Sequence, residues 1–287
     1  MTRLGLLCAA GLMAGGVFVS AQRIAIPEPR RGAGDSVTGA FEGWYYNPDG
    51  SRAFLVGYYN RNSRQDIDIP IGPANHIDPG GPDMGQPTHF LTGRQWGMFS
   101  VQAPRDFKPT DSFFWTITAN GQTTSIPLRL HADYVMSPFS EIAVGNTPPV
   151  IKFDPNGKTI QGPIATIAAA PTRTAAVGQP LELPVMVTDD MKFTSGTNAP
   201  MGRARPPVTM RWSKYRGPGT VTFEKPRPEV EKVAQSEGMF SGKSTTTAKF
   251  SEPGDYVLHL TVNDYSGDGG GGFGCCWTTG LVKVSVK

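Results

Sequence analysis

Apolar side chains recur at every second position along most of this chain, and no segment after residue 21 keeps an apolar repeat of helical period over several turns. The stretch SFFWTITANGQTTSIPLRL, residues 112–130, is the clearest case. Its two alternating runs flank Asn120-Gly121, a pair that supplies the positive φ angles of a type I′ turn. The predicted inward side chains are Phe113, Trp115, Ile117, Ile126, Leu128 and Leu130. The chain is therefore predicted to be all-β.

The composition agrees with this prediction. The 35 glycines and 26 prolines favour many turns, while an apolar content of 38% argues against disorder. The best helix candidate, residues 227–235, is short and flanked by proline.

Residues 1–21 are predicted to be a signal peptide. Arg3 gives a positive start, Leu4–Val19 is apolar, and Val19-Ser20-Ala21 matches the small-x-small cleavage pattern, so the mature chain would begin near Gln22. A membrane anchor is the alternative, but the apolar stretch is shorter than the roughly 20 residues that a span needs. The protein is therefore expected to be exported to the periplasm or the cell exterior, with no membrane span in the mature chain.

The charges are few and scattered. The formal net charge is +3 and charged residues make up 18% of the chain. The densest basic stretch, residues 203–216, is interrupted by prolines and glycines, whereas nucleic-acid binding needs a clustered basic face. No nucleic-acid partner is expected.

The chain divides into two predicted domains. Residues 22–38 are rich in Pro, Gly and Arg and indicate a flexible linker. Residues 39–145 carry aromatic, alternating runs and indicate an N-terminal aromatic-rich β domain. Residues 146–287 open on a proline-rich turn and continue with several short runs of one-sided alternation. The sequence thus predicts two β-sandwich-like domains in tandem.

The second domain resembles a PKD-type immunoglobulin-like domain over about residues 178–286. The resemblance rests on WSKYRGPG at 212–219 and on FSEPGDYVLHLTVND at 250–264. It implies that Trp212 is the core tryptophan and Tyr256 the corner tyrosine of such a sandwich. It also implies a role as an extracellular spacer or binding module. The glycine run and Cys275-Cys276 lie outside the PKD pattern, and the N-terminal domain is similar to no family that we identify.

This resemblance also predicts which loops meet. In an immunoglobulin-like sandwich the B–C and F–G loops lie at the same end, which would gather several acids with the cysteines and a tryptophan. These residues are Asp189, Asp190, Asp264, Asp268, Cys275, Cys276 and Trp277. Calcium takes about 6–8 oxygen ligands and is a candidate ligand of the four aspartates. The competing interpretation is that they are turn-forming, solvent-exposed aspartates.

Cys275 and Cys276 are adjacent and leave three alternatives open. A vicinal disulfide is possible in an oxidising compartment, because no other cysteine of the mature chain competes for either sulfur. Two reduced thiols on opposite faces of a strand, or a bridge to another molecule, are the other two. With a vicinal bridge, Trp277 would stand beside it as part of a rigid apolar platform.

The aromatic residues of the first domain suggest a binding face. Trp44 and Tyr46 share one face of a strand and could stack on sugar rings, although core packing is the alternative for most aromatics here. His259 alternates with leucines and is expected to be exposed on the polar face of its strand.

No motif for catalysis is present, so we expect a non-catalytic binding or interaction protein that recognises an extracellular polysaccharide or an envelope protein. Apart from the calcium hypothesis, no cofactor is expected. The alternative is a secreted hydrolase with its site in the N-terminal domain near the 72–89 loop, which His76 and His89 bracket. That alternative requires a pocket with converging His, Asp or Glu side chains near the loop. A structural spacer is the third interpretation.

Overall fold

A computed structural model describes residues 31–141, 145–192, 207–236, 238–264 and 275–287. In this part of the chain the fold is all-β, as predicted, and the only helical element is the short 3-10 turn η1, Ala132–Tyr134. None of the described residues forms a helix with the length and apolar character needed to cross a membrane. The predicted signal peptide, residues 1–21, lies outside the described residues.

The first domain consists of two three-stranded sheets and a short strand pair. One sheet has the order β1-β2-β6, the other the order β4-β7-β8, and β3 pairs with β5. Their bounds are β1 Val37–Tyr46, β2 Arg52–Asn60, β3 Ile67–Asp68, β4 Asn75–Asp78, β5 His89–Phe90, β6 Gly93–Gln102, β7 Phe113–Ala119 and β8 Gln122–Leu128. The hairpin prediction is confirmed: Asn120 and Gly121 have φ angles of 50° and 75°, and Phe113, Trp115 and Ile117 are buried.

The second domain is a sandwich of two larger sheets. One sheet has the order β10-β9-β12-β16-β14 with β15 also paired to β16, and the other has the order β11-β18-β17-β13. The bounds are β9 Val150–Lys152, β10 Ile160–Gln161, β11 Thr172–Ala175, β12 Leu181–Asp189, β13 Thr209–Arg216, β14 Val221–Phe223, β15 Glu231–Ser236, β16 Met239–Phe250, β17 Gly254–Asn263 and β18 Trp277–Val286. Residues 227–235, the best helix candidate, form no helix, which agrees with the all-β prediction: their second half pairs as an edge strand with β16.

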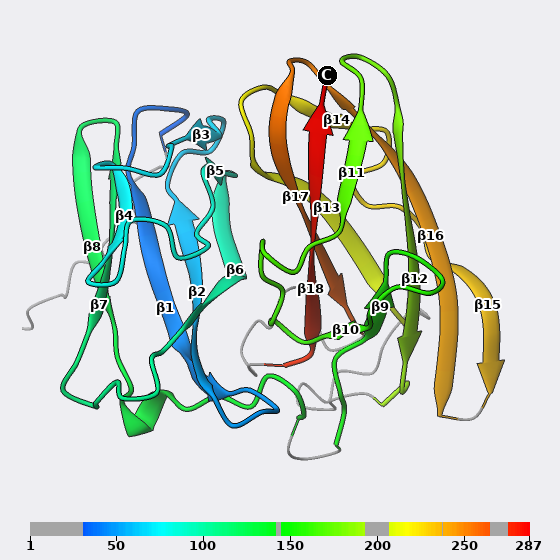
Figure 1. Ribbon diagram of the computed structural model, residues 1–287, viewed down its shortest axis with the longest axis horizontal. Helices are drawn as coiled ribbons and strands as arrows, with labels where there is room; N and C mark the ends of the chain where they lie inside the picture. Colours follow the sequence, from blue (N-terminus) through cyan, green and yellow to red (C-terminus); the bar gives the residue numbers. More distant parts are fainter. Residues whose placement is uncertain (1–30, 142–144, 193–206, 237, 265–274) are drawn as a thin grey trace, which may run out of the picture.

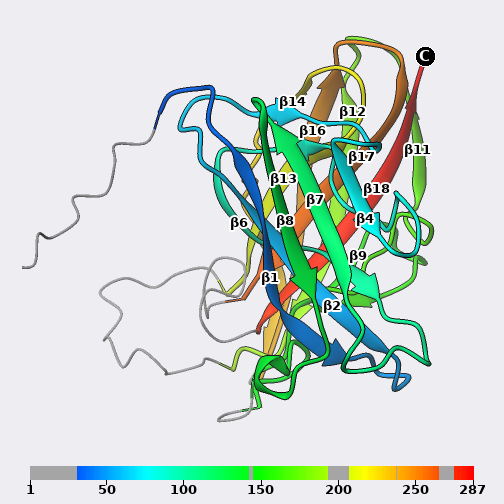
Figure 2. The same cartoon turned by 90° about the vertical axis from the view of Figure 1, so that its left-hand side faces the viewer.

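The two domains pack face to face, and the sheet β1-β2-β6 is buried on both sides (Figures 1 and 2). Phe54 and Val56 of β2 point into the core of the first domain. Ala53 and Leu55, which alternate with them, pack against Trp277 of the second domain. The outer face of the β13-β17-β18 sheet is thus covered by the first domain. We call this contact between the domains the seam.

The 72–89 loop fastens the seam at one end. Arg216 of β13 forms two hydrogen bonds of 2.9 and 2.8 Å with the carboxylate of Asp83, and it also donates to the carbonyl oxygen of Gln86. The Tyr215 hydroxyl donates to the carbonyl of Gly85, and the backbone N–H of Thr88 donates to the carbonyl of Tyr215. The loop that the hydrolase hypothesis singled out is therefore clamped between the domains.

His259 lies within the seam, so the prediction that it is exposed is wrong. Alternation identified the correct strand face, but the first domain covers that face. The side chain is 2% exposed and its ring stacks on Tyr215 with centroids 5.5 Å apart. Burial lowers the pKa of His259 to about 4, and a hydrogen bond with the backbone of Met98 only partly opposes this shift.

The lowered pKa of His259 predicts a loss of stability in acid. Below about pH 6.5 the unfolded chain takes up a proton at His259 that the folded chain takes up only near pH 4. The free energy of unfolding should therefore fall by about 3 kcal/mol through this residue as the pH drops from 6.5 to 4. Urea unfolding at several pH values measures it. His259→Phe should remove the loss of stability that this residue causes in acid. The control His131→Gln, at an exposed site, should keep that loss. An unchanged loss in His259→Phe would contradict the lowered pKa of His259.

Candidate functional site

A cleft follows the seam on one side of the molecule. It consists of two cavities of about 540 and 500 Å³, and Arg211 and Arg227 line both, so the cavities adjoin. We call the whole the seam cleft. Its tryptophan end contains Trp96 and Arg94, and its histidine end contains His89, Asp66 and Asp68. Both domains contribute walls, and the cleft exists only because they are docked.

Trp96 owes its position to a bulge in β6. In the pairing of β2 with β6, Tyr58 lies opposite Gln95 and Val56 lies opposite Phe99, so residues 96–98 face the single residue Gly57. A bulge of this kind bends the strand and re-aims a side chain. The Trp96 side chain is turned outward and is 44% exposed, although its strand is otherwise largely buried.

A partly buried ion pair fixes the indole of Trp96. The Arg94 guanidinium lies 3.9 Å from the centroid of the Trp96 ring, and its Nη2 is 2.9 Å from Glu42 Oε1. The Glu42 carboxylate also accepts the backbone N–H of Gly97 at 3.0 Å. Burial raises the pKa of Glu42, and the Gly97 N–H and Arg94 oppose that shift. Gly57 makes room for the pair, because a Cβ there would collide with Glu42 Oε1 and Arg94 Nη1. The indole therefore forms a rigid surface.

The second domain supplies the rest of the lining of the tryptophan end. Its polar lining residues include Arg211, Arg227, Glu229, Thr261 and Asn263, beside the apolar Val208, Met210, Pro228 and Val230. Arg211 Nη1 reaches Gln95 Oε1 across the seam at 3.4 Å, whereas Arg227 is exposed. An aromatic ring on one side thus faces donors and acceptors on the other, an arrangement typical of small-molecule sites.

The histidine end is a closed network of charges. His89 Nδ1 lies 2.9 Å from Asp68 Oδ1, and its Nε2 lies 3.9 Å from Asp66 Oδ2. Lys214, whose side chain is 7% exposed, contacts the same Asp68 oxygen at 3.0 Å. Burial alone would raise the pKa of Asp68, but the hydrogen bonds and charges of His89 and Lys214 together lower it. Asp68 is therefore held as a carboxylate between two donors.

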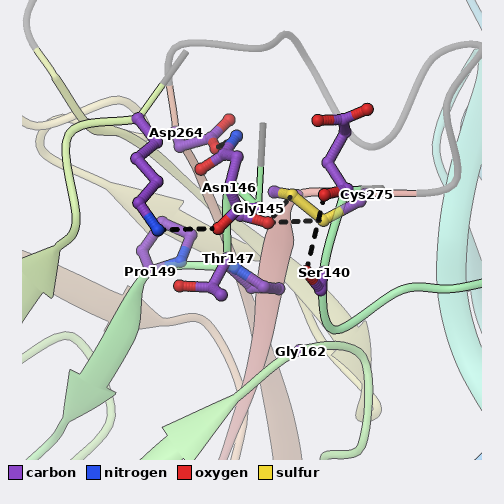
Figure 3. Close-up of a disulfide and its surroundings, with 12 residues drawn as sticks. Ser140, Gly145, Asn146, Thr147, Pro149, Gly162, Asp264 and Cys275 are labelled. Carbon is purple, nitrogen blue, oxygen red and sulfur yellow. Dashed lines mark hydrogen bonds between the residues drawn. A yellow bond between two sulfur atoms is a disulfide. The ribbon is translucent and has the colours of Figure 1, made fainter. Parts of the chain in front are cut away.

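The cysteines form a vicinal disulfide at the start of β18, the first of the three alternatives. Cys275 and Cys276 are both buried, and their sulfurs lie 4.0 and 3.5 Å from the carbonyl oxygen of Asn146, in the segment that joins the domains (Figure 3). Thr278, two residues further on, donates to the carbonyl of Pro149 in the same segment. The disulfide thus packs against the chain where it passes from one domain to the other.

Three of the predicted calcium ligands lie in this region, and they are held by protein groups. Asn146 Nδ2 donates to Asp264 at 2.5 Å, as Figure 3 shows, and Thr147 donates to Asp190 through N–H and hydroxyl. Burial raises the pKa of Asp189 to about 7, and the charges of Asp264 and Asp190 add to the shift. Among the described residues, its Oδ2 has no hydrogen-bond partner. Asp268 lies outside the described residues, among which no group of three metal-ligating side chains is found. Calcium binding stays a prediction.

The three aromatic ligand candidates lie apart from the seam cleft. Trp277 is 1% exposed and packs in the seam, with Gly97 directly against its indole. Trp44 is buried and donates through Nε1 to the carbonyl of His131. Tyr46 is 56% exposed and meets the Trp44 ring edge-on. Neither tryptophan therefore offers a surface to a ligand, because each fills a packed layer.

Sequence reasoning missed the platform formed by Glu42, Arg94 and Trp96. One signal was present: Trp96 precedes a glycine in the middle of the strand pattern RQWGMF, and a glycine inside a strand often marks a bulge. The facing arginines could not be placed from local pattern, since they come from the other domain.

No family model matches the chain, and no curated protein matches it. Among solved structures the chain is similar to domains 4 and 5 of the S-layer protein SbsC, with 10% identity and a TM-score of 0.22 over 61% of this chain and 65% of that one. It is also similar to an endo-fucoidan hydrolase of glycoside hydrolase family 107, with 12% identity and a TM-score of 0.21 over 90% of this chain and 30% of that one. The chain spans less than two-thirds of the length of either, and likenesses this weak carry no functional argument.

Proposed function

We propose that this chain is an exported, non-catalytic binding protein that holds a carbohydrate, such as an extracellular or envelope polysaccharide, in the seam cleft. The observation that carries the proposal is the outward Trp96 ring, which is held by a partly buried Glu42–Arg94 ion pair and lines a cavity of about 500 Å³. A flat ring suits the apolar face of a sugar, and the polar groups opposite suit its hydroxyls. Export is part of the proposal and rests on residues 1–21.

The hydrolase alternative has one observation in its favour, because His89, Asp66 and Asp68 converge beside the 72–89 loop. A glycosidase needs one carboxyl group with a raised pKa to protonate the leaving oxygen. The pKa of Asp68 is shifted in the opposite direction, and His89 and Lys214 both engage its Oδ1. This cluster is better suited to holding the domains together, which favours binding over hydrolysis.

We also propose that the second domain is a PKD-type module. Two features support the resemblance. The Tyr256 hydroxyl donates to the carbonyl of Glu252, four residues upstream, as a corner tyrosine does. Trp212 is 2% exposed and lies in the core between the two sheets.

Glycan binding should depend on Trp96. Trp96→Ala in the full mature chain is expected to weaken binding to a positive glycan from an array by about tenfold or more, since the ring provides the stacking surface. Titration calorimetry measures the change. Phe114→Ala, which removes a comparably exposed ring from β7, is the matched control and should bind normally. Equal affinity of Trp96→Ala and the native chain contradicts the proposed site.

A further inference from the structure

Two arginines of the seam cleft, Arg211 and Arg227, have no carboxylate partner within the described part of the chain, unlike three other arginines. Arg94, Arg173 and Arg216 each pair with an acid, namely Glu42, Asp154 and Asp83. Arg211 has one hydrogen bond to Gln95, and Arg227 has none, within the described part of the chain. Neither guanidinium group has an ion pair there with a described Asp or Glu. Both line the two adjoining cavities, so they stand where the two ends of the cleft meet.

From this pair of guanidinium groups, and resting on the carbohydrate-binding function proposed above, we infer that the ligand is an acidic glycan. Its carboxylate or sulfate group contacts Arg211 and Arg227 while a neighbouring sugar ring stacks on Trp96. A guanidinium group presents a planar fork of N–H donors that matches the oxygens of either anion. Because Arg211 is anchored to Gln95 across the seam, one of the two donors is already positioned before the ligand arrives.

The charges elsewhere in the cleft restrict the charge density of this ligand. Asp66 and Glu252 line the histidine end, where Lys214 is already paired with Asp68, and Glu229 lines the tryptophan end. A second anionic group placed at either end would meet like charges. The cleft therefore favours a glycan in which acidic units alternate with neutral ones over a uniformly charged polymer.

Hyaluronan oligosaccharides, which carry a carboxylate on every second sugar, are a suitable probe. The same oligosaccharides with the carboxylates reduced to alcohols are their neutral counterpart. Keratan sulfate oligosaccharides with a sulfate on every second sugar, beside their desulfated form, make up the sulfate arm. Titration calorimetry with the full mature chain is expected to show at least tenfold tighter binding of an anionic probe than of its neutral counterpart. The double variant Arg211→Gln/Arg227→Gln should remove this difference. Thermal unfolding checks that the variant is folded.

Two controls keep the test specific. Arg227→Gln alone leaves the seam hydrogen bond of Arg211 intact and should still lose part of the preference for the anion. Arg105→Gln/Arg129→Gln removes two exposed charges that line neither cavity, and it should bind as the native chain does. Loss of the preference in this control would indicate non-specific attraction and would overturn the inference.

The remaining outcomes separate this inference from the proposed function. Equal binding of charged and neutral probes that still depends on Trp96 overturns the acidic-glycan inference and leaves carbohydrate binding standing. No binding of any probe, with the native chain folded, overturns both.

Discussion

Replacing Trp277 with alanine is expected to lower the free energy of unfolding by about 3–5 kcal/mol, the range for deleting a large buried aromatic side chain. Trp277 is 1% exposed, and it fills the seam between Tyr45, Ala53 and Leu55 of the first domain and its own strand. Gly97 leaves space for the indole, because a Cβ there would come within 2.5 Å of it. The cavity left by alanine would therefore open where the domains meet.

Urea unfolding monitored by fluorescence and by circular dichroism measures this loss. Trp277→Phe should recover most of the stability, since the Trp277 Nε1 group makes no hydrogen bond within the described residues. Trp96→Ala removes the same residue type from an exposed position and should cost far less. A Trp277→Ala variant as stable as Trp96→Ala would show that the domains do not pack through this residue.

Replacing Asp189 with asparagine is expected to raise the free energy of unfolding at pH 8 by about 4 kcal/mol. The pKa of Asp189 is about 7 in the folded chain and 3.8 as the ordinary value. As the pH rises between these values, the unfolded chain releases a proton that the folded chain keeps, so the native protein loses stability. Asparagine carries no charge and retains an oxygen that can accept the N–H of Met191, the present partner of Asp189.

The check is the pH profile of unfolding between pH 4 and 8. Asp189→Asn should abolish the part of the stability that falls with rising pH, whereas Asp255→Asn at an exposed position should not. Between about pH 4 and 6.5, rising pH increases stability through His259 and decreases it through Asp189. The free energy of unfolding of the native protein should therefore change less with pH than that of His259→Phe or of Asp189→Asn. A profile of Asp189→Asn parallel to the native one would contradict the raised pKa.

The strands were predicted correctly from the sequence. Which strand faces are covered by the other domain was not. Alternation placed Phe113, Trp115 and Ile117 on one buried face, because period two follows from the backbone alone. It also placed His259 on the face opposite its leucine neighbours, yet that face is buried by another domain. Local pattern specifies which side chains share a face, and only the docked structure specifies whether water or protein lies there.

The sequence predicted the group of loops that holds the disulfide, but it did not predict the seam cleft. Loop topology brought the cysteines and three of the aspartates to one end, and the disulfide joins residues adjacent in sequence. The seam cleft depends on contacts between residues far apart in sequence, such as Arg211 with Gln95. A bulge and a partly buried ion pair set the direction of Trp96, and neither follows from periodicity.

The sheet β1-β2-β6 belongs to two hydrophobic cores at once, and this limits how the molecule can be divided. A fragment ending near residue 145 would expose Tyr45, Ala53 and Leu55 to water, and the complementary fragment would expose Trp277. Each fragment alone would therefore carry an exposed apolar surface that favours aggregation. The second sandwich is therefore not expected to behave as an independent module when it is fused to another protein. Any recognition that requires Trp96 and Arg211 together belongs to the undivided chain.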